Sequence, residues 1–183
     1  DVCSSDLACR EEGLEPVVTL QHFTHPAWLG IDAWLLDETT DLFEIFVRHT
    51  LTRLNDRLAD VHGQSPVRWY VTINEPNMLV LNTYLNRCFP GGPDAGIAIG
   101  LRAYNRLLAA HVRAYNAVHD LYESRGWDRP MVSMNTFCSD VYWSDVMLLD
   151  LLRLRETGVK PSEVGGYFKA RAEDLSLHFA VAA

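Results

Sequence analysis

Short apolar runs alternate along the chain with longer segments in which apolar residues recur every three or four positions. The short runs are rich in β-branched and aromatic residues, a composition that favours strands. They predict buried strands over Pro16–Leu20, Trp69–Ile73 and Met131–Met134. The longer segments have the spacing of amphipathic helices. They predict helices over 41–62, about 101–126 and about 145–155, and a partly helical tail over 161–183.

Local signals set the expected ends of these elements. Asp41 and Glu44 have the spacing of a capping box, and Gly63 is a natural helix stop. The stretch from Asn77 to Gly100 contains two prolines and two glycines at positions 90–93, so we expect a loop there.

The order strand, helix, strand, helix, strand, helix predicts parallel strands joined by right-handed crossovers. Each strand runs into polar residues at its carboxyl end: Gln21-His22, Asn74-Glu75 and Asn135. That end carries the active site in a (β/α)₈ barrel and the ligand in an open doubly wound sheet. No strand is followed by GxGxxG or GxxxxGK[ST], so we expect no nucleotide or dinucleotide cofactor.

Composition and charge narrow the class of protein. The chain has 183 residues, of which 48% are hydrophobic and 22% charged, with a net charge of −8. These values exclude a disordered or collagen-like chain, and the acidic balance without a basic stripe argues against nucleic-acid binding. No apolar stretch is long enough to span a bilayer. Four scattered cysteines form no zinc or disulfide framework, which favours a cytoplasmic location.

We interpret the first seven residues as a cloning or assembly scar that does not belong to the natural protein. Asp1–Leu7 matches the in-frame translation of a common sequencing adapter, so we expect a scar at 1–7 and one domain piece over 8–183. A complete (β/α)₈ barrel needs about 250 residues, whereas this stretch supplies only three strand–helix units. The fold class predicted is therefore α/β, as a partial (β/α)₈ barrel that belongs to a longer enzyme.

The stretch Thr72–Pro76 holds the most informative chemistry. A Glu at a strand end can protonate a leaving oxygen, and an Asn beside it can hydrogen-bond a sugar hydroxyl. Asn74 and Glu75 have this arrangement, with His22 after the neighbouring strand.

Several stretches in this order resemble glycoside hydrolase family 1, the β-glucosidase and β-galactosidase family. The resemblance covers about Glu12 to Asn135. The stretches are Gly13–Leu20, His22–Leu29, Phe46–Val47, Trp69–Asn77, Phe89–Gly91 and Leu107–Tyr115. The family has a (β/α)₈ barrel and cleaves β-glycosides with retention, so the resemblance implies strands three to five of such a barrel.

The resemblance also implies roles for individual residues. Glu75 matches the general acid/base, and Asn74 matches the residue that binds the hydroxyl next to the anomeric carbon. His22 matches a sugar-binding histidine, and Phe23 stands where the family often has Trp, keeping a stacking face but losing an N–H donor. Asn135 lies where the family often has an Asn, which makes it the last candidate for substrate binding.

Three departures from the family pattern limit what the resemblance implies. The family's Phe-Pro-Pro-Gly reads Phe89-Pro90-Gly91-Gly92 here, and the tail beyond Val141 matches the family poorly. A retaining mechanism needs a second carboxylate about 5 to 5.5 Å from the first. The family carries it in a Thr-Glu-Asn-Gly segment that this sequence lacks. We therefore expect a β-glucosidase-like fragment that holds the acid/base, lacks the nucleophile and is inactive alone.

Other interpretations of the candidate residues stay open. Asn74 could form a turn, His22 could be a core histidine, and Asn135 has a residue type more often structural than ligand-binding. His22 and His25 lack a third metal ligand at convincing spacing, so we expect no metal. As a whole, the chain could instead be a degenerate carbohydrate-binding relative, or belong to another glycosidase family with Asn-Glu at a strand end.

Tryptophan and cysteine residues give weaker signals. Trp28, Trp34 and Trp143 could stack on sugars, although single tryptophans more often pack in a core. Cys138 has no base partner and is expected to be a bystander.

Overall fold

A computed structural model describes residues 2–137 and 146–182 of the chain. The chain forms two compact units, Asp1–Asn135 and Thr136–Ala183. The candidates Cys138 and Trp143 and the predicted helix start at Asp145 lie outside the described residues.

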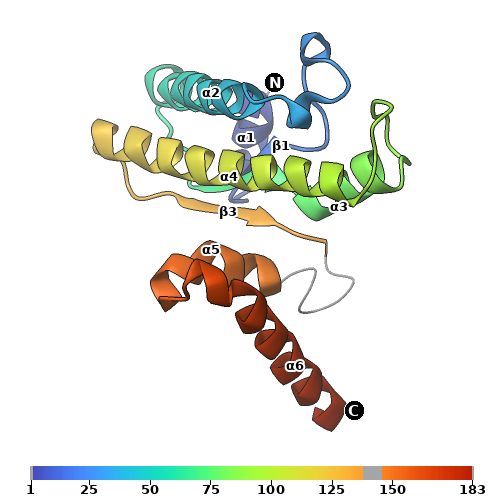
Figure 1. Ribbon diagram of the computed structural model, residues 1–183. Coiled ribbons are helices and arrows are strands. Elements are labelled where there is room, and N and C mark those ends of the chain that lie inside the picture. The colour runs from blue at the N-terminus through green and yellow to red at the C-terminus, as the bar shows by residue number, and fades with distance from the viewer. Residues whose placement is uncertain (1, 138–145, 183) are drawn as a thin grey trace. The chain divides into compact units, whose positions relative to one another are not determined.

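The first unit is built on three parallel strands, β1 (Val17–Gln21), β2 (Trp69–Asn74) and β3 (Met131–Asn135), in the order β1-β2-β3. The long helices α2 (Thr39–His62) and α4 (Ile97–Arg125) lie side by side (Figure 1) and pack against each other. Helix α4 also packs against β2 and β3, and Asn55 of α2 is hydrogen-bonded to Tyr70 of β2. The predicted strands, their parallel order and the two long helices are therefore confirmed.

The sheet has one covered and one open face. Alternate side chains such as Tyr70 and Thr72 are buried on the face that the helices cover. On the other face, the register aligns Val17, Trp69 and Met131, which are 60%, 37% and 47% exposed. Three large apolar side chains in one row on a solvent-exposed face are unusual for a complete domain.

A buried polar cluster links the two long helices to the amino-terminal end of the sheet. The Asn55 Nδ2 donates to the hydroxyls of Tyr70 and Tyr122 at 3.2 and 3.1 Å, and its Oδ1 accepts the Val67 N–H at 3.0 Å. Asn55 is fully buried, so these bonds replace all of its contact with water.

Two predicted boundaries are wrong. Helix α2 begins at Thr39, so Asp41 and Glu44 lie inside it and form no capping box. Both carboxylates instead bind Arg113 of α4. The predicted loop also contains α3 (Pro76–Val80) and a π-helical turn (Leu81–Leu85), because Leu79, Val80 and Tyr84 pack into the core.

The amino-terminal helix α1 (Val2–Glu11) contains most of the residues assigned to a scar. Asp6 is only 2% exposed, and its Oδ2 lies 2.8 Å from the Arg10 Nε. The origin of residues 1–7 stays a prediction.

The second unit contains α5 (Met147–Thr157) and α6 (Val164–Ala182), joined through a 3₁₀ turn (Pro161–Glu163). An ion pair of 2.9 Å between Arg171 Nε and Asp150 Oδ2 links the two helices. The helix predicted over 145–155 is thus present with shifted ends, and the tail is helical over most of its length.

Candidate active site

The carboxyl ends of the three parallel strands bring the candidate residues to one edge of the sheet. Asn74 is the register partner of Asn135, and Gln21 is the partner of Ile73. Because parallel strands end on the same side, residues that follow β1, β2 and β3 share that edge.

Asn74, Glu75 and Asn135 are joined by two hydrogen bonds. The Asn135 Nδ2 donates to the Asn74 Oδ1 at 2.9 Å. The Glu75 N–H donates to the Asn135 carbonyl at 3.0 Å. A side-chain bond and a backbone bond together therefore tie the end of β2 to the end of β3.

The backbone of Glu75 is left-handed, with φ 41° and ψ 61°. Residues with a Cβ rarely adopt this conformation, and they do so mostly where surrounding structure imposes it. Here Pro76 begins α3 directly after it, and the Glu75 carbonyl accepts the Leu79 N–H at 3.0 Å. The chain thus turns sharply from strand to helix at the candidate carboxylate, and the Glu75 side chain is half-buried.

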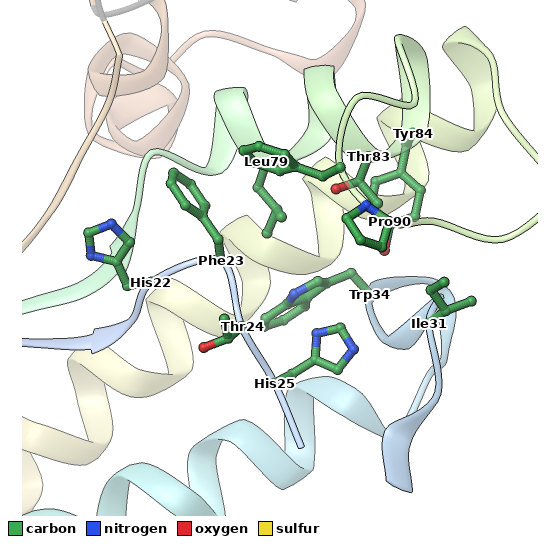
Figure 2. A pocket seen from close by; sticks show the side chains of 11 residues that line it. His22, Phe23, Thr24, His25, Ile31, Trp34, Leu79, Thr83, Tyr84 and Pro90 are labelled. Atoms are coloured by element: carbon green, nitrogen blue, oxygen red, sulfur yellow. The ribbon is translucent and has the colours of Figure 1, made fainter. Parts of the chain in front are cut away.

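His22 and Phe23 lie at the end of β1. Their rings meet edge to face with centroids 5.0 Å apart, and Phe23 is also left-handed, with φ 66°. Phe23 packs on Phe89 with a centroid distance of 5.5 Å. Figure 2 shows the cavity beside them, of about 510 Å³, with His22 at one end of the lining and Ile31 at the other.

The loop that carries Phe89 is held by polar contacts. The Gly92 N–H donates to the Asp32 Oδ1 at 2.9 Å, and the Gly92 carbonyl accepts from the Arg87 Nη2 at 2.6 Å. A Cβ on Gly91 would lie 2.9 Å from the Thr83 carbonyl oxygen, so glycine is required for this close approach. The altered Phe-Pro-Gly-Gly sequence thus has a defined conformation beside the cavity.

One supporting residue was not singled out from the sequence. His111 of α4 is buried, and its Nδ1 lies 2.7 Å from the Thr72 hydroxyl, which donates to the Ser133 carbonyl at 3.3 Å. With the hydroxyl proton used there, His111 Nδ1 is the donor. Burial lowers the pKa of His111 to about 4, so it is neutral at pH 7. The sequence signal was a histidine within the apolar stripe of the helix.

Within residues 2–137 and 146–182, no group of three or more His, Cys, Asp or Glu side chains could hold a metal ion. None of the helices described there is long and apolar enough to cross a membrane.

Comparison with known proteins gives a consistent family signal. The family model "Glycosyl hydrolase family 1" matches residues 7–138. A cytosolic beta-glucosidase of Cavia porcellus is 31% identical over 128 residues, covering 69% of this chain and 25% of that protein. A 6-phospho-beta-galactosidase of Lacticaseibacillus rhamnosus is 29% identical over 122 residues, covering 66% of this chain and 23% of that protein. The chain thus spans about a quarter of the length of these relatives.

Solved structures show the same fold. A beta-glucosidase from Exiguobacterium marinum superposes with a TM-score of 0.56 at 24% identity, covering 73% of this chain and 28% of that chain. A beta-glycosidase from Pyrococcus horikoshii superposes with a TM-score of 0.58 at 22% identity, covering 84% of this chain and 33% of that chain. The three parallel strands and their helices are therefore arranged as in part of a (β/α)₈ barrel of this kind.

Proposed function

Because the chain belongs to glycosyl hydrolase family 1, we propose that it carries the acid/base half of a retaining β-glycosidase site. Glu75 is the general acid/base. Asn74, His22, Phe23 and Asn135 bind the sugar, with Phe23 as a stacking face. The observation that carries this proposal is the fixed position of Glu75 at the carboxyl end of β2. Its backbone there is strained, and its N–H donates to the Asn135 carbonyl.

The hydrogen bond between the two asparagines gives Asn74 a defined role. With its Oδ1 occupied by the Asn135 Nδ2, the Asn74 amide is oriented, and its own Nδ2 is the group left to donate to a substrate hydroxyl. Because the Asn74 amide is already oriented, less conformational entropy is lost when it binds the substrate in the transition state. Asn135 thus acts on the sugar partly through Asn74.

The chain supplies only part of the site. We propose that residues 8–183 are a piece of one barrel domain, holding strands three to five. Support comes from the open, apolar face of the sheet and from relatives about four times as long as the matched region. A nucleophilic carboxylate would then come from a segment outside this sequence, and the chain alone would not hydrolyse a glycoside.

The substrate class proposed is a terminal β-linked sugar. Relatives named as β-glucosidases and 6-phospho-β-galactosidases both support a β-glycoside, without separating the two sugars. A cytoplasmic location is proposed because two matched relatives are named cytosolic β-glucosidases.

The test uses the complete gene product and the variant Glu75→Gln. An amide cannot donate a carboxylic proton, so glycosylation should slow strongly for alkyl β-glucosides and little for aryl β-glucosides with acidic leaving groups. The matched control is Glu15→Gln, an exposed carboxylate before β1, which should leave both rates unchanged. Pre-steady-state rates measure the step directly. An equal loss for all leaving groups would contradict the acid role.

A further inference from the structure

Strand β2 changes its register against β3 just before the candidate acid/base. Val71 is the partner of Ser133, but Asn74 is the partner of Asn135, so the two residues 72–73 of β2 face one residue of β3. A bulge of this kind bends a strand and re-aims the side chains that follow it. The alternation of buried and exposed side chains also breaks here, because both residues of this β2 bulge are fully buried.

The β2 bulge brings the two candidate asparagines together. Without the shift, the register of the first half of the strands would make Ile73, and not Asn74, the partner of Asn135. The observed register allows the side chains of Asn74 and Asn135 to bond at 2.9 Å. It also places the Glu75 N–H 3.0 Å from the Asn135 carbonyl oxygen. Because a slip of one residue turns later side chains to the other face, the bulge decides which groups β2 presents to the site.

Two hydrogen bonds connect the β2 bulge to α4. The Thr72 hydroxyl donates to the Ser133 carbonyl at 3.3 Å, across the two strands where the register begins to shift. Since its own proton is used there, the hydroxyl accepts from the His111 Nδ1, which lies 2.7 Å away. Thr72 is fully buried and His111 is 7% exposed, so water has little access to these bonds.

Helix α4 gives these bonds a firm support. The helix has 29 residues and packs against both β2 and β3. Leu107 and Ala114, about one turn to either side of His111, are completely buried, so the imidazole is held between the helix and the sheet. Burial also lowers the pKa of His111 to about 4, so the ring donates its hydrogen bond as a neutral group at pH 7.

We propose that His111 and Thr72 are positioning residues for the acid/base, an inference that rests on the proposed function. They hold the β2 bulge, and the bulge sets the partner of Asn74 and the position of Glu75. Both residues act through the strand and do not touch the substrate. An apolar side chain at position 72 would leave the imidazole N–H and the Ser133 carbonyl without these bonds, which favours a different local register.

The test is the variant Thr72→Val in the complete gene product. Valine keeps the shape and the strand preference of threonine but lacks the hydroxyl. A displaced Glu75 matters most where the leaving group needs a proton. The value of kcat/KM should therefore fall about tenfold more for an alkyl β-glucoside than for an aryl β-glucoside with an acidic leaving group. Thr72→Ser keeps the hydroxyl and should restore most of the lost rate.

Thr39→Val is the matched control. Thr39 is 3% exposed, and its hydroxyl donates to the Ala33 carbonyl at the start of α2, outside the sheet. The control thus loses a buried hydrogen bond of the same kind, so its stability should fall comparably. The ratio of the two kcat/KM values should nevertheless stay that of the parent, because neither the β2 bulge nor Glu75 is altered. A general loss of stability would move both variants alike.

His111→Leu is the second variant, and it decides the matter even where Thr72→Val does not fold. It removes the imidazole donor and should change the rate ratio in the same direction, whereas His111→Asn keeps a donor near the Nδ1 position and should restore it. Because both residues act through one chain of hydrogen bonds, the double variant should change the ratio no more than Thr72→Val alone.

Glu75→Gln in the same assays separates this inference from the proposed function. A leaving-group dependence in Glu75→Gln, together with the parent ratio in Thr72→Val and His111→Leu, would overturn the positioning role and leave the acid role intact. The absence of that dependence in Glu75→Gln itself would overturn the proposed function, and this inference with it.

Discussion

Replacing Glu75 with glycine should stabilise the fold while removing the proposed acid. The residue has φ 41° and ψ 61°, and the start of α3 at Pro76 leaves it little freedom to relax. A left-handed conformation costs a residue with a Cβ roughly 1–2 kcal/mol, and glycine adopts it without that cost. The strained backbone at Glu75 is then explained by the need for a carboxylate in the proposed active site, and not by a contribution to stability.

The size of the effect follows from comparing Glu75→Gly with Glu75→Ala. Both variants lose the carboxylate, but only alanine keeps the Cβ. Glycine loses about 0.5–1 kcal/mol more conformational free energy on folding, which offsets part of the strain relief. We therefore expect the Glu75→Gly protein to be more stable than the Glu75→Ala protein by about 0.5–1 kcal/mol.

Urea unfolding of both variants, followed by far-ultraviolet circular dichroism, measures this difference. Ala109→Gly is the matched control, because Ala109 is exposed within α4 and has ordinary helical surroundings. There the glycine should cost about 1 kcal/mol, the opposite sign. Equal stability of the two Glu75 variants, or a less stable glycine variant, would refute the argument that the Glu75 backbone is strained.

Two further predictions concern buried polar groups. Asn55→Leu should lower the free energy of unfolding by about 3 kcal/mol, because it strands the buried Val67 N–H and removes both tyrosine contacts; a loss below about 1 kcal/mol in urea would argue against the cluster. The buried His111, with its pKa lowered from 6.5 to about 4, should make stability fall as pH drops from about 6.5 to about 4, by up to about 3 kcal/mol. Between these two pH values the His111 imidazole binds a proton in the unfolded chain and stays neutral in the folded chain. His111→Gln should flatten most of this dependence, while His119, whose pKa burial also lowers, accounts for a remainder; an unchanged pH profile would contradict a neutral, buried His111.

The strands and long helices could be predicted from pattern alone because burial there follows a simple period. Residues 69–72 alternate between the covered and open faces of the sheet, and the apolar residues of α4 recur at three and four. The start of α2 was missed because Asp41 and Glu44 satisfy a local capping rule, yet both are used in tertiary ion pairs with Arg113. The short helix α3 was hidden among prolines and glycines, where tertiary packing of Leu79 and Tyr84 decides the structure.

The edge that holds the candidate site was also predictable, since strand ends follow from strand assignment. What could not be predicted is how those residues are fixed. The Asn74–Asn135 bond depends on register between strands 61 residues apart in sequence, and the left-handed backbone of Glu75 depends on how β2 joins α3. The burial of Gln21 is a further case, because a glutamine at a strand end gives no sequence signal of lost contact with water.

The most direct test of Glu75 as the acid/base is the pH dependence of kcat/KM in the complete gene product. The alkaline limb of a retaining glycosidase reports ionisation of its general acid. With a poor leaving group, the parent should show this limb, and Glu75→Gln should lose it while the acidic limb remains. An alkaline limb that persists unchanged in Glu75→Gln would show that another group donates the proton, and would contradict the account.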